Sequence, residues 1–290
     1  MILPADLLNK LRRSRFLLPN PRTFQGIGER RSQKNGSGME FSDYRTYEVG
    51  DDLRHLDPYI WARTGDYVIR QYRVEEPLQI SIVLDASASM NIGHPNKYQF
   101  ARELVAALSF VGLAGGDFVQ ILACHDGRLL SSPLLQGINR ADVLFHWLEN
   151  LSPAGANLGQ SLISLNNNCS FRKLMLVVSD FWWADLDRDL KTLLRNRSDL
   201  FAMHLLNHEE TNPDKIGLGE IQLMDIETNQ TVNVDLDETN CHIYRQSLTD
   251  WQNNIRNKIQ GYQGKYMTVL SNSSLDDLFL RTFRQQGLIA

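Results

Sequence analysis

A buried strand that ends in three oxygen-bearing side chains constrains this chain more than any other feature. Residues 79–84 read Gln-Ile-Ser-Ile-Val-Leu, and Asp85, Ser87 and Ser89 follow at alternate positions. A short apolar, β-branched run is typical of a strand that is covered on both faces of a parallel sheet. In such sheets, ligands bind at the carboxyl ends of the strands. Carboxylate and hydroxyl oxygens at this edge predict a site for Mg²⁺ or Mn²⁺.

The spacing of these three residues resembles the Asp-x-Ser-x-Ser motif of von Willebrand factor A domains, where the motif forms a metal-ion-dependent adhesion site. The resemblance implies that a partner protein binds there and completes the metal shell with its own carboxylate. A second interpretation is a serine-rich turn that caps the following helix, because Ser and Asp favour such positions. The rest of the chain has to decide between the two.

Two later segments match the other metal loops of that domain to different degrees. Asp180 follows the apolar run Lys-Leu-Met-Leu-Val-Val-Ser at 173–179, so the resemblance predicts that it converges with the first motif. Residues 153–158 stand where the second loop is expected, but Ala156 replaces the usual threonine, and Asn157 offers an amide oxygen in place of a carboxylate. The lost hydroxyl weakens the case for a metal site and leaves open the alternative of a degenerate loop that only begins the helix at 158–165. The predicted metal ligands are therefore Asp85, Ser87, Ser89, Asp180 and Asn157, and whether a metal is bound stays open.

Charges of both signs alternate with aromatic residues between positions 36 and 63. The order is Gly-Ser-Gly-Met-Glu-Phe at 36–41, Tyr-Arg-Thr-Tyr at 44–47, Gly-Asp-Asp-Leu-Arg-His-Leu-Asp at 50–57 and Ala-Arg at 62–63. Such mixed charges around aromatics predict a paired network. Followed by Asp-Ala-Ser-Ala-Ser-Met at 85–90, this order resembles the bacterial family called domain of unknown function 58. The signature residues are Gly38, Glu40, Phe41, Arg45, Tyr47, Gly50, Asp51, Arg54, Asp57 and Arg63.

This family resemblance covers the chain from about Gly36 onward and implies a fold, a partner and a role. The fold is an α/β, von Willebrand A-like (Rossmann-like) domain, with a mostly parallel sheet and helices on both faces. Members are typically encoded beside MoxR-type AAA+ ATPases, so the implied partner is such an ATPase or its client, in the assembly or maturation of a protein complex. One departure is Pro58-Tyr59, where the family usually has Trp, although Trp61 lies close by.

Two parts of the chain are expected. Residues 1–75 form a basic N-terminal arm and the signature region, packing on the core, and residues 76–290 form the von Willebrand A-like domain with a β-hairpin inserted at about 208–238. From Lys10 to Gly38, eight Lys and Arg residues face Glu29 alone. The arm binds an anionic partner or is simply solvated. Residues 66–76 alternate apolar and polar, which predicts an edge strand leading to the central one.

Three aromatic residues, Phe181, Trp182 and Trp183, come directly after Asp180. Aromatics at the carboxyl end of a strand suit a partner-binding surface, although they could equally anchor the next helix. The sequence lacks the Gly-x-Ser-x-Gly, His-Glu-x-x-His and phosphate-loop motifs of common enzymes. We therefore expect a non-enzymatic protein-binding module. The alternatives are a metal-free scaffold that docks through residues 181–183 and, less favoured, a Mg²⁺-dependent hydrolase.

Charge, apolar runs and cysteine spacing indicate the compartment and the kinds of partner to expect. The net charge of −4 gives no general case for nucleic-acid binding. No run approaches the roughly 18 apolar residues of a membrane span, and the first residues lack the pattern of a secretory signal. The three cysteines, Cys124, Cys169 and Cys241, have no metal-ligand or redox spacing, which predicts buried free thiols. These features predict a cytoplasmic protein.

Overall fold

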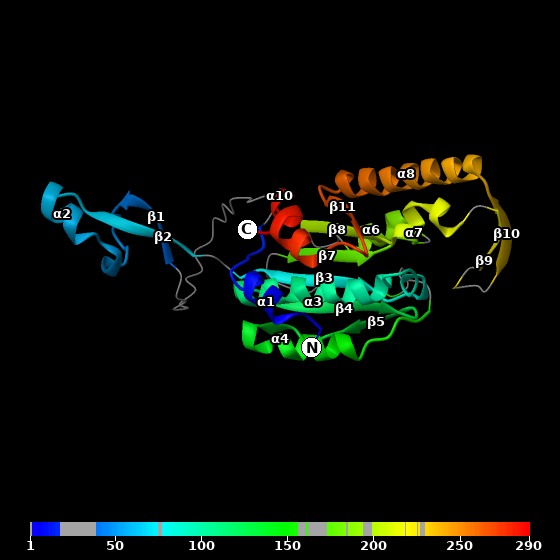
Figure 1. The fold of residues 1–290 in the computed structure, drawn as a ribbon. Helices are drawn as coiled ribbons and strands as arrows, with labels where there is room; N and C mark the ends of the chain where they lie inside the picture. Colours follow the sequence, from blue (N-terminus) through cyan, green and yellow to red (C-terminus); the bar gives the residue numbers. More distant parts are fainter. Residues whose placement is uncertain are drawn as a thin grey trace. The chain divides into compact units, whose positions relative to one another are not determined.

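The computed structural model describes residues 2–17, 39–74, 77–155, 161, 173–183, 185–193, 199–217, 219–224, 226 and 230–290 (Figure 1). The chain forms two compact units: unit 1 comprises Met1–Pro21 with Leu78–Ala290, and unit 2 comprises Arg22–Pro77. The observed boundary at residue 77 lies close to the predicted one at 75. The first 21 residues, however, belong with the larger unit instead of the signature region, because Leu3, Leu7, Leu11 and Phe16 are buried in its core.

The main sheet of unit 1 has the strand order β11-β8-β7-β3-β4-β5. Neighbours pair in parallel except at one edge, where β5 and the short β6 pair antiparallel with β4. When the short β6 is left out, the strands numbered along the chain have the doubly wound order 3-2-1-4-5-6, and the topological switch point lies between β3 and β7. The strands are β3 (Gln79–Asp85), β4 (Phe118–His125), β5 (Arg128–Ser131), β6 (Leu135–Gln136), β7 (Lys173–Ser179), β8 (Asp199–Leu206) and β11 (Lys265–Leu270).

Helices cover both faces of this sheet, because the side chains of each buried strand alternate between two apolar clusters. Ile82 and Leu84 of β3 belong to the first cluster and Val83 to the second. Six of the described elements cover the first cluster: α1 (Ala5–Leu11), α3 (Lys97–Gly115), α4 (Ala141–Glu149), α9 (Leu275–Asp277), η5 (Leu278–Thr282) and α10 (Phe283–Gln285). Two described helices cover the second cluster: α6 (Leu186–Leu193) and α8 (Glu238–Gly261). The predicted α/β fold with a mostly parallel sheet is confirmed.

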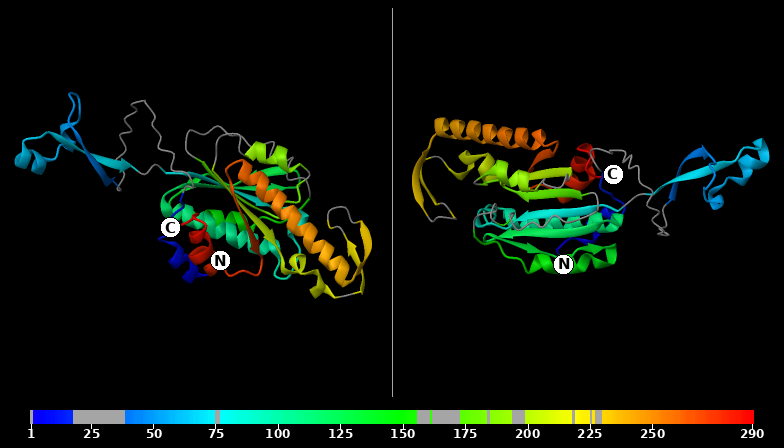
Figure 2. Two further views of the ribbon diagram at one scale, coloured as in Figure 1. Left: turned by 90° about the horizontal axis from the view of Figure 1, so that it is seen from above. Right: turned by 180° about the vertical axis from the view of Figure 1, so that it is seen from behind.

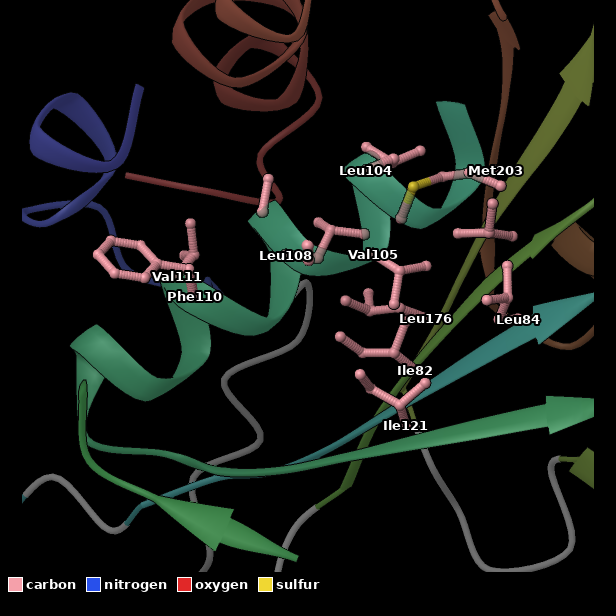
Figure 3. Close-up of a cluster of buried hydrophobic side chains, with 14 of the residues drawn as sticks. Ile82, Leu84, Leu104, Val105, Leu108, Phe110, Val111, Ile121, Leu176 and Met203 are labelled. Atoms are coloured by element: carbon pink, nitrogen blue, oxygen red, sulfur yellow. The ribbon is translucent and has the colours of Figure 1, made fainter. Parts of the chain in front are cut away.

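Helix α3 is the central element of the first cluster, and Figure 3 shows its Leu104, Val105 and Leu108 pointing toward strand side chains. It begins where the Asn96 side chain accepts a hydrogen bond from the backbone N–H of Gln99, a normal N-cap. A Cβ added at Gly112 would lie 2.7 Å from Val119 and 2.9 Å from Ile80, so α3 approaches β3 and β4 closely there. This seating fixes the first residue of α3, Lys97, near the carboxyl ends of the strands.

Between β8 and α8 lie α7 (His208–Thr211), η4 (Pro213–Ile216) and the antiparallel hairpin of β9 (Gly219–Met224) and β10 (Thr231–Leu236). The predicted hairpin is confirmed, and Figure 2 shows it joined to the start of α8. Helix α8 begins at Glu238, where the Asp237 side chain accepts a hydrogen bond from the backbone N–H of Asn240.

Unit 2 is built on a two-stranded antiparallel sheet of β1 (Met39–Thr46) and β2 (Val68–Val74), with η1 (Leu53–His55) and α2 (Pro58–Thr64) between them. The prediction that residues 66–76 form an edge strand leading to the central strand is therefore corrected, since β2 pairs with β1. Gly38 lies outside the described residues, and Glu40 and Phe41 are described only by their backbone in β1.

The predicted charge network of the signature is present in unit 2. Arg45 pairs with Asp51 at 2.5 Å and Arg54 with Asp52 at 2.6 Å. Gly50, with φ +112°, makes the turn before them. In the same unit, Trp61 stacks on Tyr67 with ring centroids 6.0 Å apart, and Tyr47 makes a tilted contact with Tyr67 at 6.3 Å. Arg63 is exposed.

Asp57 is the most buried polar residue of this network. Its carboxylate accepts hydrogen bonds from the backbone N–H groups of Tyr59 and Ile60, which caps α2, and from Arg70 Nε at 2.8 Å. The Arg70 hydrogen bond, opposed by desolvation and helped by the two amides, lowers the pKa of Asp57 to about 2. The signature thus serves as an internal scaffold of unit 2.

Cys124 and Cys241 are buried free thiols, as predicted, while Cys169 lies outside the described residues. In the described part of the chain, no helix combines the length and the apolar character needed to cross a membrane. The cytoplasmic location stays a prediction from the sequence.

Candidate functional site

Asp85 is the last residue of β3 and is only 2% exposed. One carboxylate oxygen, Oδ1, accepts the backbone N–H of Ser87 at 3.1 Å, and the other, Oδ2, accepts the Ser179 hydroxyl at 2.5 Å. Burial, and next the negative charge of Asp180, raise the pKa of Asp85 above its usual range. These surroundings favour an additional positive charge beside the carboxyl group.

Ser87 and Ser89 lie in the turn after β3, which includes η2 (Ala88–Met90), and their hydroxyl oxygens are 2.9 Å apart. The second predicted loop reaches this turn, because the Ala88 N–H donates to the Gly155 carbonyl at 2.9 Å. Gly155 has φ +70°, and a Cβ there would lie 2.5 Å from the backbone of Asp126, so only glycine suits the position. Ala156 and Asn157 lie outside the described residues.

Asp180 follows β7 at the neighbouring strand end, as predicted, but it is paired with a lysine that the sequence analysis missed. Lys97 is 0% exposed, and its Nζ donates to Asp180 Oδ2 at 3.2 Å and to Glu210 Oε1 at 2.7 Å. Lysine is normally exposed, and nothing local to residue 97 predicts burial. The one indication in the sequence is that Lys97 begins the helix that follows the Asp85 strand, which places it near the strand ends that carry Asp85 and Asp180.

Glu210 is held in place by a capping box at the start of α7. Its backbone N–H donates to Asn207 Oδ1, and its Oε2 accepts the Asn207 N–H, both at 2.7 Å. Beside Lys97, His204 is fully buried, and its Nδ1 lies 2.6 Å from the Tyr266 hydroxyl. Burial and the Lys97 charge lower the pKa of His204 to about 3, so this ring is neutral.

The donors of the first loop suit a divalent cation. Within the described part of the chain, no Lys or Arg is paired with Asp85, and its two oxygens retain free lone pairs beside the Ser87 and Ser89 hydroxyls. Hard oxygen donors of this kind are those that Mg²⁺ prefers. No three His, Cys, Asp or Glu side chains of the described residues are grouped to hold a metal. A cation here would therefore need further ligands from water, a partner or the loop after Gly155.

The three aromatics after Asp180 face different ways. Phe181 adopts φ +58° and is buried in the second cluster, so the prediction that it contacts a partner is wrong. Trp183 is half-buried, and its Nε1 donates to Ser179 Oγ at 3.0 Å. Trp182 is 62% exposed and stacks on Trp251 of α8, with ring centroids 4.3 Å apart. Of the three, Trp182 alone exposes most of its surface to solvent.

A cavity of about 630 Å³ opens at the start of α3, on the side of the first apolar cluster. It is lined by residues of α1, of the segment just before α3, of the first turns of α3 and of the segment after β11, including His94, Glu103 and Asp276. Because that segment follows the carboxyl end of β11, the cavity belongs to the same edge of the sheet as the oxygen cluster.

The basic arm is only partly described. Lys10 pairs with Asp276 at 2.6 Å, and Arg15 donates to the Gly115 carbonyl at 3.0 Å. These two cations therefore bind within unit 1.

The fold and the site together define a doubly wound α/β protein with an oxygen-rich cluster at the switch point of its sheet. The chain belongs to the family described as "Protein of unknown function DUF58", whose model matches residues 43–253. The family predicted from the signature is thus confirmed.

Curated relatives include "Uncharacterized protein Rv1480" of Mycobacterium tuberculosis and "Uncharacterized protein Mb1516" of Mycobacterium bovis. Each is 26% identical over 204 residues, which is 67% of this chain and 62% of the relative. The match therefore spans less than two thirds of the relatives' length.

Solved structures with some similarity include BatB from Bacteroides thetaiotaomicron, at 15% identity and a TM-score of 0.42, covering 72% of this chain and 98% of that one. The SpRpn10 VWA domain is 10% identical with a TM-score of 0.40, covering 69% and 92%. The family assignment rests on the sequence match and not on these weaker likenesses.

Proposed function

We propose that this protein is a non-enzymatic, von Willebrand A-like protein-binding module that engages its partner at the carboxyl edge of the main sheet. The observation that carries the proposal is the cluster of Asp85, Ser87 and Ser89 at the switch point, the place where doubly wound sheets bind ligands. The exposed Trp182 at the next strand end supports it, because exposed tryptophans are frequent anchors of interfaces.

The proposed cofactor is Mg²⁺ or Mn²⁺, held by Asp85, Ser87 and Ser89 and, in the second loop, by Asn157. When bound, the cation supplies a positive centre that an acidic residue of the partner can complete. By resemblance, the partner is a MoxR-type AAA+ ATPase or its client, and the role is the assembly or maturation of a protein complex. We propose no hydrolytic role, since in the described structure no histidine is hydrogen-bonded to Ser87 or Ser89 as a base.

The test is calorimetric titration of the protein with Mg²⁺ and with Mn²⁺. We expect binding by the wild type, its loss in Asp85→Ala, and its retention in Asp142→Ala, which removes an exposed carboxylate from α4. The lack of any binding at millimolar metal would contradict the metal-dependent proposal for the free protein.

The second candidate function is a metal-free scaffold. It is favoured by Trp182, which is exposed and whose ring stacks on that of Trp251. Its test is pull-down of the MoxR-type ATPase with and without a chelator. Binding that survives the chelator and Asp85→Ala, yet falls at least about tenfold in Trp182→Ala, would support the scaffold. Val143→Ala, an exposed apolar residue of α4, is the matched control.

A further inference from the structure

We infer that the ion pair with Lys97 keeps Asp180 from binding the metal. The metal shell is then completed by a carboxylate of the partner protein. The inference rests on the proposed function and adds a specificity-determining residue to it. Its basis is the full burial of Lys97 and the direct contact of its Nζ with two carboxylates, at 3.2 Å for Asp180 and 2.7 Å for Glu210.

A buried ammonium group persists only where its charge is compensated, because desolvation of an isolated charge is very costly. Lys97 finds its compensation from two directions: Asp180 comes from the end of β7, and Glu210 from α7 after β8. Glu210 cannot turn away easily, because Asn207 holds both its N–H and its Oε2. The ammonium is therefore fixed beside Asp180 by the fold itself.

Asp180 and Asp85 differ in how many carboxylate oxygens they can offer to a metal. Asp180 Oδ2 is taken by Lys97, and Asp180 Oδ1 lies 3.4 Å from the N–H of Trp182. Asp85, by contrast, is bonded only to uncharged donors, the backbone N–H of Ser87 and the hydroxyl of Ser179. Asp85 is thus the one carboxylate of the described cluster that has no cation of its own. A metal bound to a single internal carboxylate leaves positions that an acidic partner can fill.

The experiment titrates Mg²⁺ and Mn²⁺ alone into the full chain, by calorimetry and by thermal unfolding with and without metal. Lys97→Met frees Asp180, so we expect its Kd for metal to fall at least about tenfold relative to wild type, since added ligand charge tightens such sites. We also expect Mg²⁺ to raise its Tm more than that of the wild type. Asp180→Asn alone should bind metal within about twofold of wild type, and Lys97→Met/Asp180→Asn should lose the gain.

A purely structural lysine would lower the Tm without tightening metal binding, and that result overturns the inference. If Asp85→Ala abolishes wild-type binding while Lys97→Met binds no more tightly, the proposed function stands and the role of Lys97 falls. If the wild type binds no metal but Lys97→Met does, the role of Lys97 stands and the metal-dependent half of the proposed function falls. If Lys97→Met is unfolded, folding on addition of Mg²⁺ supports the inference, and continued unfolding at millimolar Mg²⁺ overturns it.

Discussion

At the scale of single residues, Ser179 links the carboxylate of the site to the aromatic segment beside it. Its hydroxyl donates to Asp85 and accepts the Phe181 N–H at 2.8 Å and the Trp183 Nε1–H at 3.0 Å. The Ser179 side chain is fully buried, so its hydroxyl cannot exchange these partners for water. One small hydroxyl therefore orients both the candidate metal ligand and the chain that presents Trp182.

Replacing Ser179 by alanine should lower the free energy of unfolding by about 1–3 kcal/mol, because buried polar groups lose their partner. It should also weaken metal binding, since Asp85 loses a donor that orients it. Chemical denaturation and calorimetric titration measure the two effects. The control is Ser109→Ala, a buried serine that bonds only the Val105 carbonyl of its own helix. A loss of stability no larger than that of the control would contradict the prediction.

The low pKa of Asp57 predicts that acid destabilises unit 2. Its pKa is about 2 in the folded protein against a usual 3.8, so the ionised form stabilises the fold. That contribution is complete above pH 3.8 and is lost as the pH falls toward 2. Asp57→Asn should therefore increase hydrogen exchange of residues 39–74 at pH 6 and differ less from wild type near pH 2. The exposed Asp66→Asn is the control; an equal difference at both pH values would refute the assignment.

At the scale of elements, the seating of α3 on the sheet determines where Lys97 lies, and this seating depends on the lack of a side chain at Gly112. Gly112→Ala should cost about 1–3 kcal/mol through overpacking against Val119 and Ile80. Gly261→Ala, where no atom lies within 4 Å of the added Cβ, should be neutral or stabilising. Denaturant midpoints compare the two. A neutral Gly112→Ala would mean that α3 can shift without strain.

The central strands were largely predictable, because β3 and β7 are mostly apolar runs, as is typical of strands that are covered on both faces. The position of Asp85 followed from the same pattern. The partner of Asp180 did not, since Lys97 lies 83 residues away and its burial depends on tertiary contacts. Nor did the exposure of Trp182 and the burial of Phe181, which depend on the positive φ at Phe181.

At the scale of the whole molecule, the N-terminal segment is part of the core of unit 1. Leu3, Leu7 and Leu11 are buried there, and α1 contacts α3. Phe16 forms a β-bridge with Ile289, and Arg15 and Ala290 exchange backbone hydrogen bonds. Unit 1 therefore includes two segments of the chain, Met1–Pro21 and Leu78–Ala290, with the whole of unit 2 between them in the sequence.

Removal of residues 1–17 should destabilise unit 1 by about 6–12 kcal/mol, since four buried apolar side chains contribute about 1.5–3 kcal/mol each as an upper estimate. Such a loss is comparable with the whole stability of a domain, so the truncated chain should melt without a cooperative transition. Circular dichroism against temperature checks this. Lys10→Ala, which breaks only an exposed ion pair, should melt like wild type. A cooperative melt of the truncated chain would contradict the prediction.

The bridge between Phe16 and Ile289 has a consequence for how the protein is made. A ribosome releases the chain from the N-terminus, and domains generally fold as units while synthesis continues. Helix α1 is synthesised before unit 2, and the residues that pair with the segment after α1, Leu288 to Ala290, are synthesised after unit 2. Unit 2 lies wholly between these two events. During translation, unit 2 can therefore fold while the core of unit 1 still lacks residues 288–290, which pair with the segment after α1.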